Sequence, residues 1–79
     1  MSYFVYVLRS KVDGKLYIGS SGDIEKRLSD HTCGRVDATK KRRPLELVYK
    51  EIFENKELAR KRELFFKTGK GRLVLRNLM

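Results

Sequence analysis

The chain has 79 residues, 41% of them hydrophobic and 37% charged, which is typical of one folded domain over residues 1–79 and excludes a disordered chain. Its single cysteine excludes an internal disulfide and a cysteine-based zinc site, and it suits a reducing, cytoplasmic setting. The 19 Lys and Arg against 10 Asp and Glu give a formal net charge of +9, which favours a polyanion, most commonly nucleic acid, as the partner.

The N-terminal region predicts a β-hairpin, with no signal peptide and no membrane span. Residues 3–8 form the longest apolar run, and they are rich in aromatic and β-branched side chains, so they predict a strand. An Asp-Gly turn and a return strand over residues 15–19 follow. Because side chains alternate along a strand, Tyr17 points away from the face that holds Ile18. The pairing register of the hairpin stays open.

A helix and a basic loop come next. The segment Ser20-Ser21-Gly22 is expected to break the strand, and Ser21 or Asp23 can cap a helix that runs to about His31. Arg27 and His31 lie one turn apart on one side of that helix. Residues 32–43 are expected to form a loop that ends in a cluster of four cations.

The C-terminal half predicts one strand and two helices. Residues 46–53 form the strand, and Asn55 caps a helix over residues 56–67. The glycine-rich residues 68–71 are expected to interrupt this helix, and residues 72–78 to form a short final one. The order β-β-α-β-α-α predicts a small α+β fold, in which a three-stranded sheet is flanked by helices.

Glu63 is the single residue that most strongly suggests a functional site. It is four residues after Ala59 and three before Phe66, which the second helix is expected to bury together with Leu58 or Phe65, so Glu63 lies on or beside the apolar stripe. A carboxylate there needs a partner, because an unpaired buried charge is costly. The partner is either a nearby Lys or Arg, or one Mg²⁺ ion that keeps most of its waters.

Other polar residues also have a structural and a functional interpretation. Arg27 is either a surface residue near an aspartate or a phosphate clamp, and His31 is either structural, a phosphate ligand or a proton relay. Tyr6 and Tyr17 are either strand packing or hydroxyls that act on a substrate. Gly19 either ends the strand or lets a substrate backbone approach closely.

Taken together, these residues resemble the GIY-YIG nuclease domain, most closely its small stand-alone bacterial members, from Tyr3 to about Asn77. The motifs are Phe4-Val5-Tyr6, which keeps only the tyrosine of the first motif, and Tyr17-Ile18-Gly19. Arg27, His31 and Glu63 follow, and then Lys67-Thr68-Gly69-Lys70-Gly71-Arg72. The resemblance implies an antiparallel sheet and a metal-dependent endonuclease that hydrolyses phosphodiester bonds of DNA, in DNA repair or recombination.

The resemblance also implies roles for single residues. Glu63 would hold one Mg²⁺ or Mn²⁺ ion, and Tyr17 would orient or deprotonate the attacking water with support from Tyr6. Arg27 would stabilise the phosphate in the transition state, with His31 as a further catalytic candidate. Asn77 has an offset from Glu63 similar to that of a C-terminal asparagine in other branches of the family.

Two basic segments are the expected nucleic-acid contacts, with DNA favoured over RNA. They comprise Lys40, Lys41, Arg42 and Arg43 in the loop, and Lys67, Lys70 and Arg72 after Glu63. Gly69 and Gly71 are expected to free backbone N–H groups for phosphate, and such contacts give affinity without sequence readout. The alternatives are a nucleic-acid-binding module without turnover, or a basic interaction protein in which Glu63 is paired with Lys or Arg.

Overall fold

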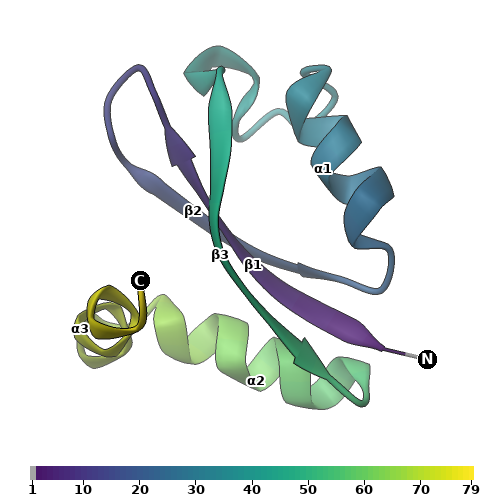
Figure 1. Cartoon of the computed structure of the whole chain (residues 1–79), viewed down its shortest axis with the longest axis vertical. Coiled ribbons are helices and arrows are strands. Elements are labelled where there is room, and N and C mark those ends of the chain that lie inside the picture. Colours follow the sequence, from purple (N-terminus) through teal and green to yellow (C-terminus); the bar gives the residue numbers. More distant parts are fainter. Residues whose placement is uncertain (1) are drawn as a thin grey trace.

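The computed structural model describes residues 2–79 and has the predicted α+β architecture (Figure 1). The elements in chain order are β1 (Tyr3–Ser10), β2 (Leu16–Ser21), α1 (Ile24–Thr32), a 3-10 helix η1 (Lys40–Arg42), β3 (Leu45–Phe53), α2 (Lys56–Phe66) and α3 (Gly69–Leu78). The strands form one antiparallel sheet in the order β2-β1-β3. The predicted fold class is therefore confirmed. No helix within residues 2–79 combines the length and the apolar character needed to cross a bilayer.

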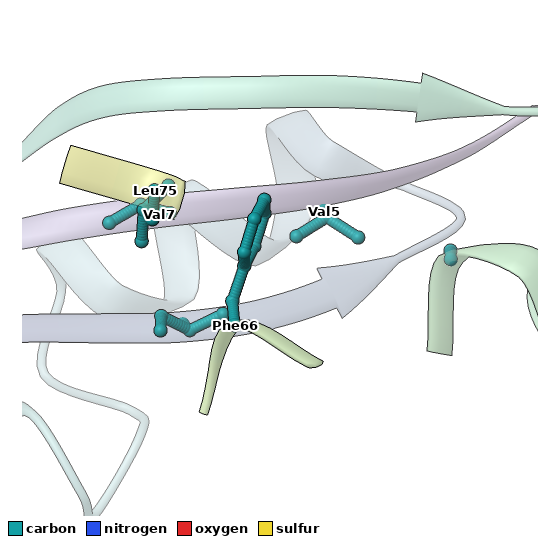
Figure 2. Packing of buried hydrophobic residues seen from close by; sticks show 6 residues of the cluster. Val5, Val7, Phe66 and Leu75 are labelled. Carbon is teal, nitrogen blue, oxygen red and sulfur yellow. The ribbon is translucent and has the colours of Figure 1, made fainter. Parts of the chain in front are cut away.

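The two faces of the sheet are covered by different helices. Figure 1 shows α1 on one side of the sheet, and α2 and α3 on the other. The core lies on the α2 side, where Val5 and Val7 of β1 meet Phe66 of α2 and Leu75 of α3 (Figure 2). All four side chains are fully buried, and burial of each contributes roughly 1.5–3 kcal/mol. This core fixes which face of β1 turns toward α2, so Tyr6 points toward α1.

The register of the hairpin determines which tyrosines meet. Tyr6 pairs with Gly19, and Leu8 pairs with Tyr17. Because alternate residues share a face, Tyr6 and Tyr17 both lie on the α1 side, while Ile18 and Ser20 lie on the α2 side. The register thereby brings the two tyrosines of the predicted site together.

The structure corrects two predicted boundaries. β2 does not break after Gly19 but continues to Ser21, since Ser20 and Ser21 pair with Val5 and Phe4 of the central strand. The final helix begins at Gly69 rather than Arg72, because the Thr68 side chain caps it by accepting from the Gly71 N–H group. The predicted interruption is therefore only a short break between α2 and α3.

The other helix ends agree with the sequence. Asp23, rather than Ser21, caps α1 by accepting from the backbone N–H group of Lys26, and Asn55 caps α2 by accepting from that of Leu58. Leu58 and Phe65 were the two candidates for burial beside Ala59 and Phe66. Phe65 packs against the core, whereas Leu58 is 45% exposed.

Candidate active site

Tyr6, Arg27 and His31 form one hydrogen-bonded cluster on the α1 side of the sheet. The Tyr6 hydroxyl lies 3.0 Å from His31 Nε2, and Arg27 Nε donates to the Tyr6 oxygen at 3.4 Å. Burial raises the pKa of Tyr6, and the hydrogen bond from Arg27 opposes this only in part. The Tyr6 hydroxyl therefore stays protonated at neutral pH, which leaves its proton free to be donated to His31.

Thr39 completes this cluster, although no sequence pattern pointed to it. Its hydroxyl oxygen lies 2.7 Å from His31 Nδ1, and its side chain is fully buried. Burial lowers the pKa of His31, and the charge of Arg27 lowers it further, so the imidazole is neutral at pH 7. One ring nitrogen then accepts and the other donates. Either Tyr6 donates to Nε2 and Nδ1–H donates to Thr39, or Nε2–H donates to Tyr6 and the Thr39 hydroxyl donates to Nδ1.

Arg27 does not form the surface ion pair that was its simpler interpretation. Asp30 binds Arg35 at 2.7 Å, and Asp23 is used as the cap of α1, so neither aspartate pairs with Arg27 among the salt bridges of residues 2–79. The hydrogen bond to Tyr6 raises the pKa of Arg27, which keeps the guanidinium charged. A half-buried, charged guanidinium that is anchored by one nitrogen is suited to clamp a phosphate.

Tyr17 stands at the open side of this cluster. Its ring packs edge-on against His31, with centroids 4.9 Å apart, and lies 6.4 Å from the Tyr6 ring. Tyr17 is half-buried, whereas Tyr6 and His31 are each only 1% exposed. Of the three rings, that of Tyr17 is therefore the most accessible to a bound strand, and His31 contacts other side chains rather than solvent.

Glu63 lies on the other side of the sheet, against the edge strand β2. Its two carboxylate oxygens accept from the Ser20 hydroxyl at 2.5 Å and from Lys67 Nζ at 2.8 Å. Burial by itself raises the pKa of Glu63, but the hydrogen bonds from Lys67 and Ser20 outweigh it, so the pKa is lowered. Glu63 is thus an ionised carboxylate that is 8% exposed, and its ion pair with Lys67 is the simpler of the two predicted partnerships.

Gly19 and Ser20 connect the two halves of the candidate site. Gly19 pairs with Tyr6 on the α1 side, and the next residue, Ser20, holds Glu63 on the α2 side. β2 is an edge strand, so the two halves lie on opposite faces of the sheet beside the same edge. The Glu63 charge is close enough to contribute to the raised pKa of Tyr6, behind burial and Tyr17.

Glu63 is the carboxylate of this site that could hold a divalent cation, although both of its oxygens already accept hydrogen bonds. No group of three or more His, Cys, Asp or Glu side chains comes together in the described part of the chain. Mg²⁺ is often held by one or two carboxylates while it keeps several waters. Glu63 supplies such a carboxylate, and Lys67, whose side chain is 47% exposed, can swing away from it. The Ser20 hydroxyl holds the other oxygen in place.

The structure distributes the predicted basic residues over several surfaces. Lys67 pairs with Glu63, and Lys70 is exposed at the start of α3. In the loop, Arg43 donates to the carbonyls of Lys40 and Thr32, while Lys41 is exposed. Arg42 and Arg72, which belong to different predicted segments, line the same cavity.

Asn77 is exposed in the last turns of α3, and its correspondence to a C-terminal asparagine of other family branches stays a prediction.

Comparisons with known proteins identify the family to which this chain is related. Residues 2–77 match the model of the GIY-YIG catalytic domain. A UPF0213 protein of Staphylococcus saprophyticus is 46% identical over 67 residues, which cover 84% of this chain and 80% of the relative. A UPF0213 protein of Staphylococcus aureus is 44% identical over 68 residues, covering 85% of this chain and 82% of the relative.

A solved structure agrees with the sequence matches. The solution NMR structure of a UPF0213 protein from Bacillus halodurans superimposes with a TM-score of 0.62 at 32% identity, covering 99% of this chain and 85% of the other. The family match spans nearly all described residues and includes the Tyr6–Arg27–His31–Thr39 cluster, Tyr17, Ser20, Glu63 and Lys67. The chain belongs to the GIY-YIG family, whose catalytic domain is of the nuclease type.

Proposed function

We propose that this protein is a divalent-metal-dependent endonuclease that hydrolyses phosphodiester bonds of DNA. The observation that carries the proposal is that two neighbouring residues of β2 connect two sets of polar side chains on opposite faces of the sheet. An ionised, buried carboxylate, Glu63, is held by Ser20, and the adjacent Gly19 faces the Tyr6–Arg27 cluster. The net charge of +9 supplies general affinity for a nucleic-acid backbone. DNA repair or recombination, where branched and flapped strands arise, is the proposed setting.

Arg27 and Tyr17 are the groups proposed to contact the reacting phosphate. The guanidinium of Arg27 is oriented by its bond to Tyr6, so it can stabilise the extra negative charge of the pentacoordinate phosphate without reorganising. Tyr17 is the accessible hydroxyl at the mouth of the cluster and is proposed to orient the attacking water by hydrogen bonding.

Tyr6, His31 and Thr39 are proposed to position these two groups. Tyr6 and His31 are buried, so they act on the substrate through Arg27 and Tyr17. His31 fixes the direction of the Tyr6 O–H bond, and Thr39 fixes the tautomer of His31.

Glu63 is the residue proposed to hold the cation. When bound there, a Mg²⁺ or Mn²⁺ ion would neutralise the scissile phosphate and stabilise the leaving oxygen. Ser20 keeps the carboxylate aimed at the edge of β2, and Lys67 occupies its second oxygen until it is displaced.

The test is cleavage of single-stranded, flapped and branched DNA by wild-type protein and the isosteric Glu63→Gln variant, with Mg²⁺ and with Mn²⁺. The matched control is Glu57→Gln, an exposed glutamate on the same helix. We expect cleavage by wild-type and Glu57→Gln proteins and loss of at least about 100-fold in Glu63→Gln, since the metal contribution is several kcal/mol. Equal cleavage by all three proteins would identify a contaminant and remove the support for the proposal.

One observation favours a second candidate function, a nucleic-acid-binding module without turnover. Both oxygens of Glu63 are already satisfied by Ser20 and Lys67, so this carboxylate is stable without a metal ion. Salt-dependent DNA binding by the wild-type protein, together with no Glu63-dependent cleavage, would favour this function. Absence of any DNA or RNA affinity at low salt would leave a basic protein with another kind of partner.

A further inference from the structure

A basic cavity of about 500 Å³ lies between the hairpin turn, η1 and α3, away from the tyrosine cluster. Its cationic lining comes from three separate segments, Lys15 before β2, Arg42 of η1, and Arg72 and Arg76 of α3. Arg72 and Arg76 are four residues apart, so they project from one face of the helix. None of the described residues that line the cavity is acidic, and the one carboxylate that pairs with a lining cation is that of Asp13 with Arg42, so the cavity keeps a net positive charge.

Arg42 is poised for an additional acceptor. Its Nε atom forms an ion pair with Asp13 at 3.7 Å, and its Nε and Nη2 atoms are buried from solvent without a hydrogen-bond partner within residues 2–79. Buried guanidinium donors are usually satisfied, so Arg42 has hydrogen-bonding capacity left over, which an acceptor in the cavity could use once the side chain turns toward it. A phosphate oxygen has the charge and the geometry that these donors match.

The floor of the cavity is apolar. Leu16, Ile18 and Leu75 line it beneath the cations. A small inorganic anion gains nothing from such a floor, whereas a nucleotide has a sugar and a base that can cover it. The combination of cations and apolar floor therefore fits a nucleotide unit better than a free phosphate ion.

The position of the cavity along β2 relates it to Glu63. Leu16, Ile18 and Ser20 alternate along the strand and share its α2-facing side, and Ser20 holds Glu63. At about 3.3 Å per residue, the floor residues lie about 7 to 13 Å from Ser20. A stacked strand advances about 3.4 Å per nucleotide, so this distance is about two to four nucleotides.

We propose that this cavity is a second phosphate-binding site for the DNA strand that is cut, and that it holds the phosphate about two to four nucleotides from the scissile one. This inference rests on the proposed nuclease function, because Glu63 defines the point of cleavage. Lys15, Arg42, Arg72 and Arg76 would bind the phosphate, and the apolar floor would receive its sugar or base. The strand would then run along the edge of β2 from Glu63 toward α3.

The experiment measures DNA binding rather than cleavage, so that failure of the nuclease proposal does not decide it. All proteins carry Glu63→Gln, and a fluorescent single-stranded DNA of about ten nucleotides is titrated over a series of salt concentrations. We expect Arg72→Gln with Arg76→Gln to weaken binding roughly ten-fold and to reduce the slope of log affinity against log salt by about 0.7 for each phosphate that is no longer neutralised. The control, Lys56→Gln with Lys61→Gln, removes the same charge from exposed sites outside the cavity.

Amide shifts in ¹⁵N NMR spectra locate the bound strand. We expect the oligonucleotide to shift the amides of Leu16, Ile18 and residues 72–76, and inorganic phosphate at equal ionic strength to leave them nearly unchanged. Equal losses of affinity in the two double variants, or shifts that miss these residues, would overturn the proposal. Larger shifts with inorganic phosphate than with DNA would also overturn it, and would identify a small-anion site.

Discussion

The hydroxyl of Tyr6 occupies the space that a side chain on Gly19 would need. The two residues are paired across β1 and β2, and a Cβ atom on Gly19 would lie 2.5 Å from the Tyr6 oxygen and 2.7 Å from its Cζ atom. Gly19 does not end the strand, which continues to Ser21. Its missing side chain instead leaves room for the tyrosine that binds Arg27 and His31.

We therefore expect Gly19→Ala to lower the cleavage rate strongly and to lower the free energy of unfolding only moderately. The new methyl group would push the Tyr6 ring away from Arg27 and His31 and so disturb the phosphate clamp, while β2 keeps its pairing. Overpacking of this kind costs about 1–3 kcal/mol. Cleavage assays and urea denaturation of the same preparation measure the two effects. Unchanged activity would show that the placement of Tyr6 does not matter for catalysis.

His31 should make stability depend on pH below about 6.5. Burial, and then the charge of Arg27, lower its pKa in the folded protein, while Asp30 opposes this weakly. The unfolded chain thus takes up a proton near pH 6.5 that the folded protein does not, and the free energy of unfolding falls as the pH drops below that value. The slope can reach about 1.4 kcal/mol per pH unit.

Urea denaturation between about pH 5 and pH 8 measures this dependence, and His31→Gln should flatten it. This pH range lies above the one in which the folded protein's Glu51 and Glu63 take up protons, since the pKa of each is lowered from 4.5. The two glutamates therefore do not mask the effect of His31. The chain has one histidine, so its imidazole NMR signal reports the pKa directly. A pKa above 6.5 would contradict a neutral, buried His31.

Thr39 should act as a positioning residue through the tautomer of His31. In the tautomer in which Nδ1–H donates to Thr39, Thr39→Val removes the acceptor and leaves a buried donor unsatisfied, which costs about 1–3 kcal/mol. We expect ¹⁵N imidazole shifts to show loss of the Nδ1–H tautomer, with reduced cleavage, and Thr39→Ser to restore both. Thr32→Val, at an exposed threonine of α1, is the control. An unchanged tautomer in Thr39→Val would leave Thr39 with a packing role only.

Lys67 should compete with the cation for Glu63. Lys67→Met removes the positive charge 2.8 Å from a Glu63 oxygen, so the carboxylate becomes freer to bind Mg²⁺. At saturating DNA we expect half-maximal activity at a lower Mg²⁺ concentration, and a loss of stability of about 1–3 kcal/mol because the largely buried Glu63 carboxylate then keeps only the hydrogen bond from Ser20. Lys61→Met, at an exposed lysine within α2, should change neither the Mg²⁺ requirement nor the stability. A higher Mg²⁺ requirement would mean that Lys67 assists the metal site.

Local patterns predicted much of the fold, because strands, caps and helix stripes are local. The spacing of Glu63 between Ala59 and Phe66 was enough to predict its burial. Ser20 was missed as its partner because the strand was expected to end at Gly19, although alternation from Ile18 places Ser20 on the same side. Thr39 lies in a loop without periodicity, so nothing local linked it to His31.

The sequence did contain a signal for the start of α3, a helix cap at Thr68, but the neighbouring glycines outweighed it. Two glycines in residues 68–71 favoured a break, yet Thr68 followed by Gly71 three residues later is also the spacing of a helix cap. The register of the hairpin, in contrast, depends on packing against α2 and could not be read from the strands alone.

Gly71 and Gly69 form a matched pair for testing the break between α2 and α3. A Cβ atom on Gly71 would lie 1.7 Å from the backbone oxygen of Phe65, and Gly71 is buried, whereas a Cβ atom on Gly69 would meet nothing within 4 Å. The Gly71 N–H group already donates to Thr68, so this glycine serves close helix packing rather than the phosphate contact that the sequence suggested.

We expect Gly71→Ala to lower the free energy of unfolding by about 3 kcal/mol or more, because a backbone atom cannot move aside without lifting α3 and Leu75 from the core. Gly69→Ala should raise it by up to about 1 kcal/mol, since alanine restricts the unfolded chain. Urea denaturation and DNA affinity, measured on both variants, separate packing from binding. A Gly71→Ala protein of normal stability that binds DNA poorly would restore the phosphate interpretation of this glycine.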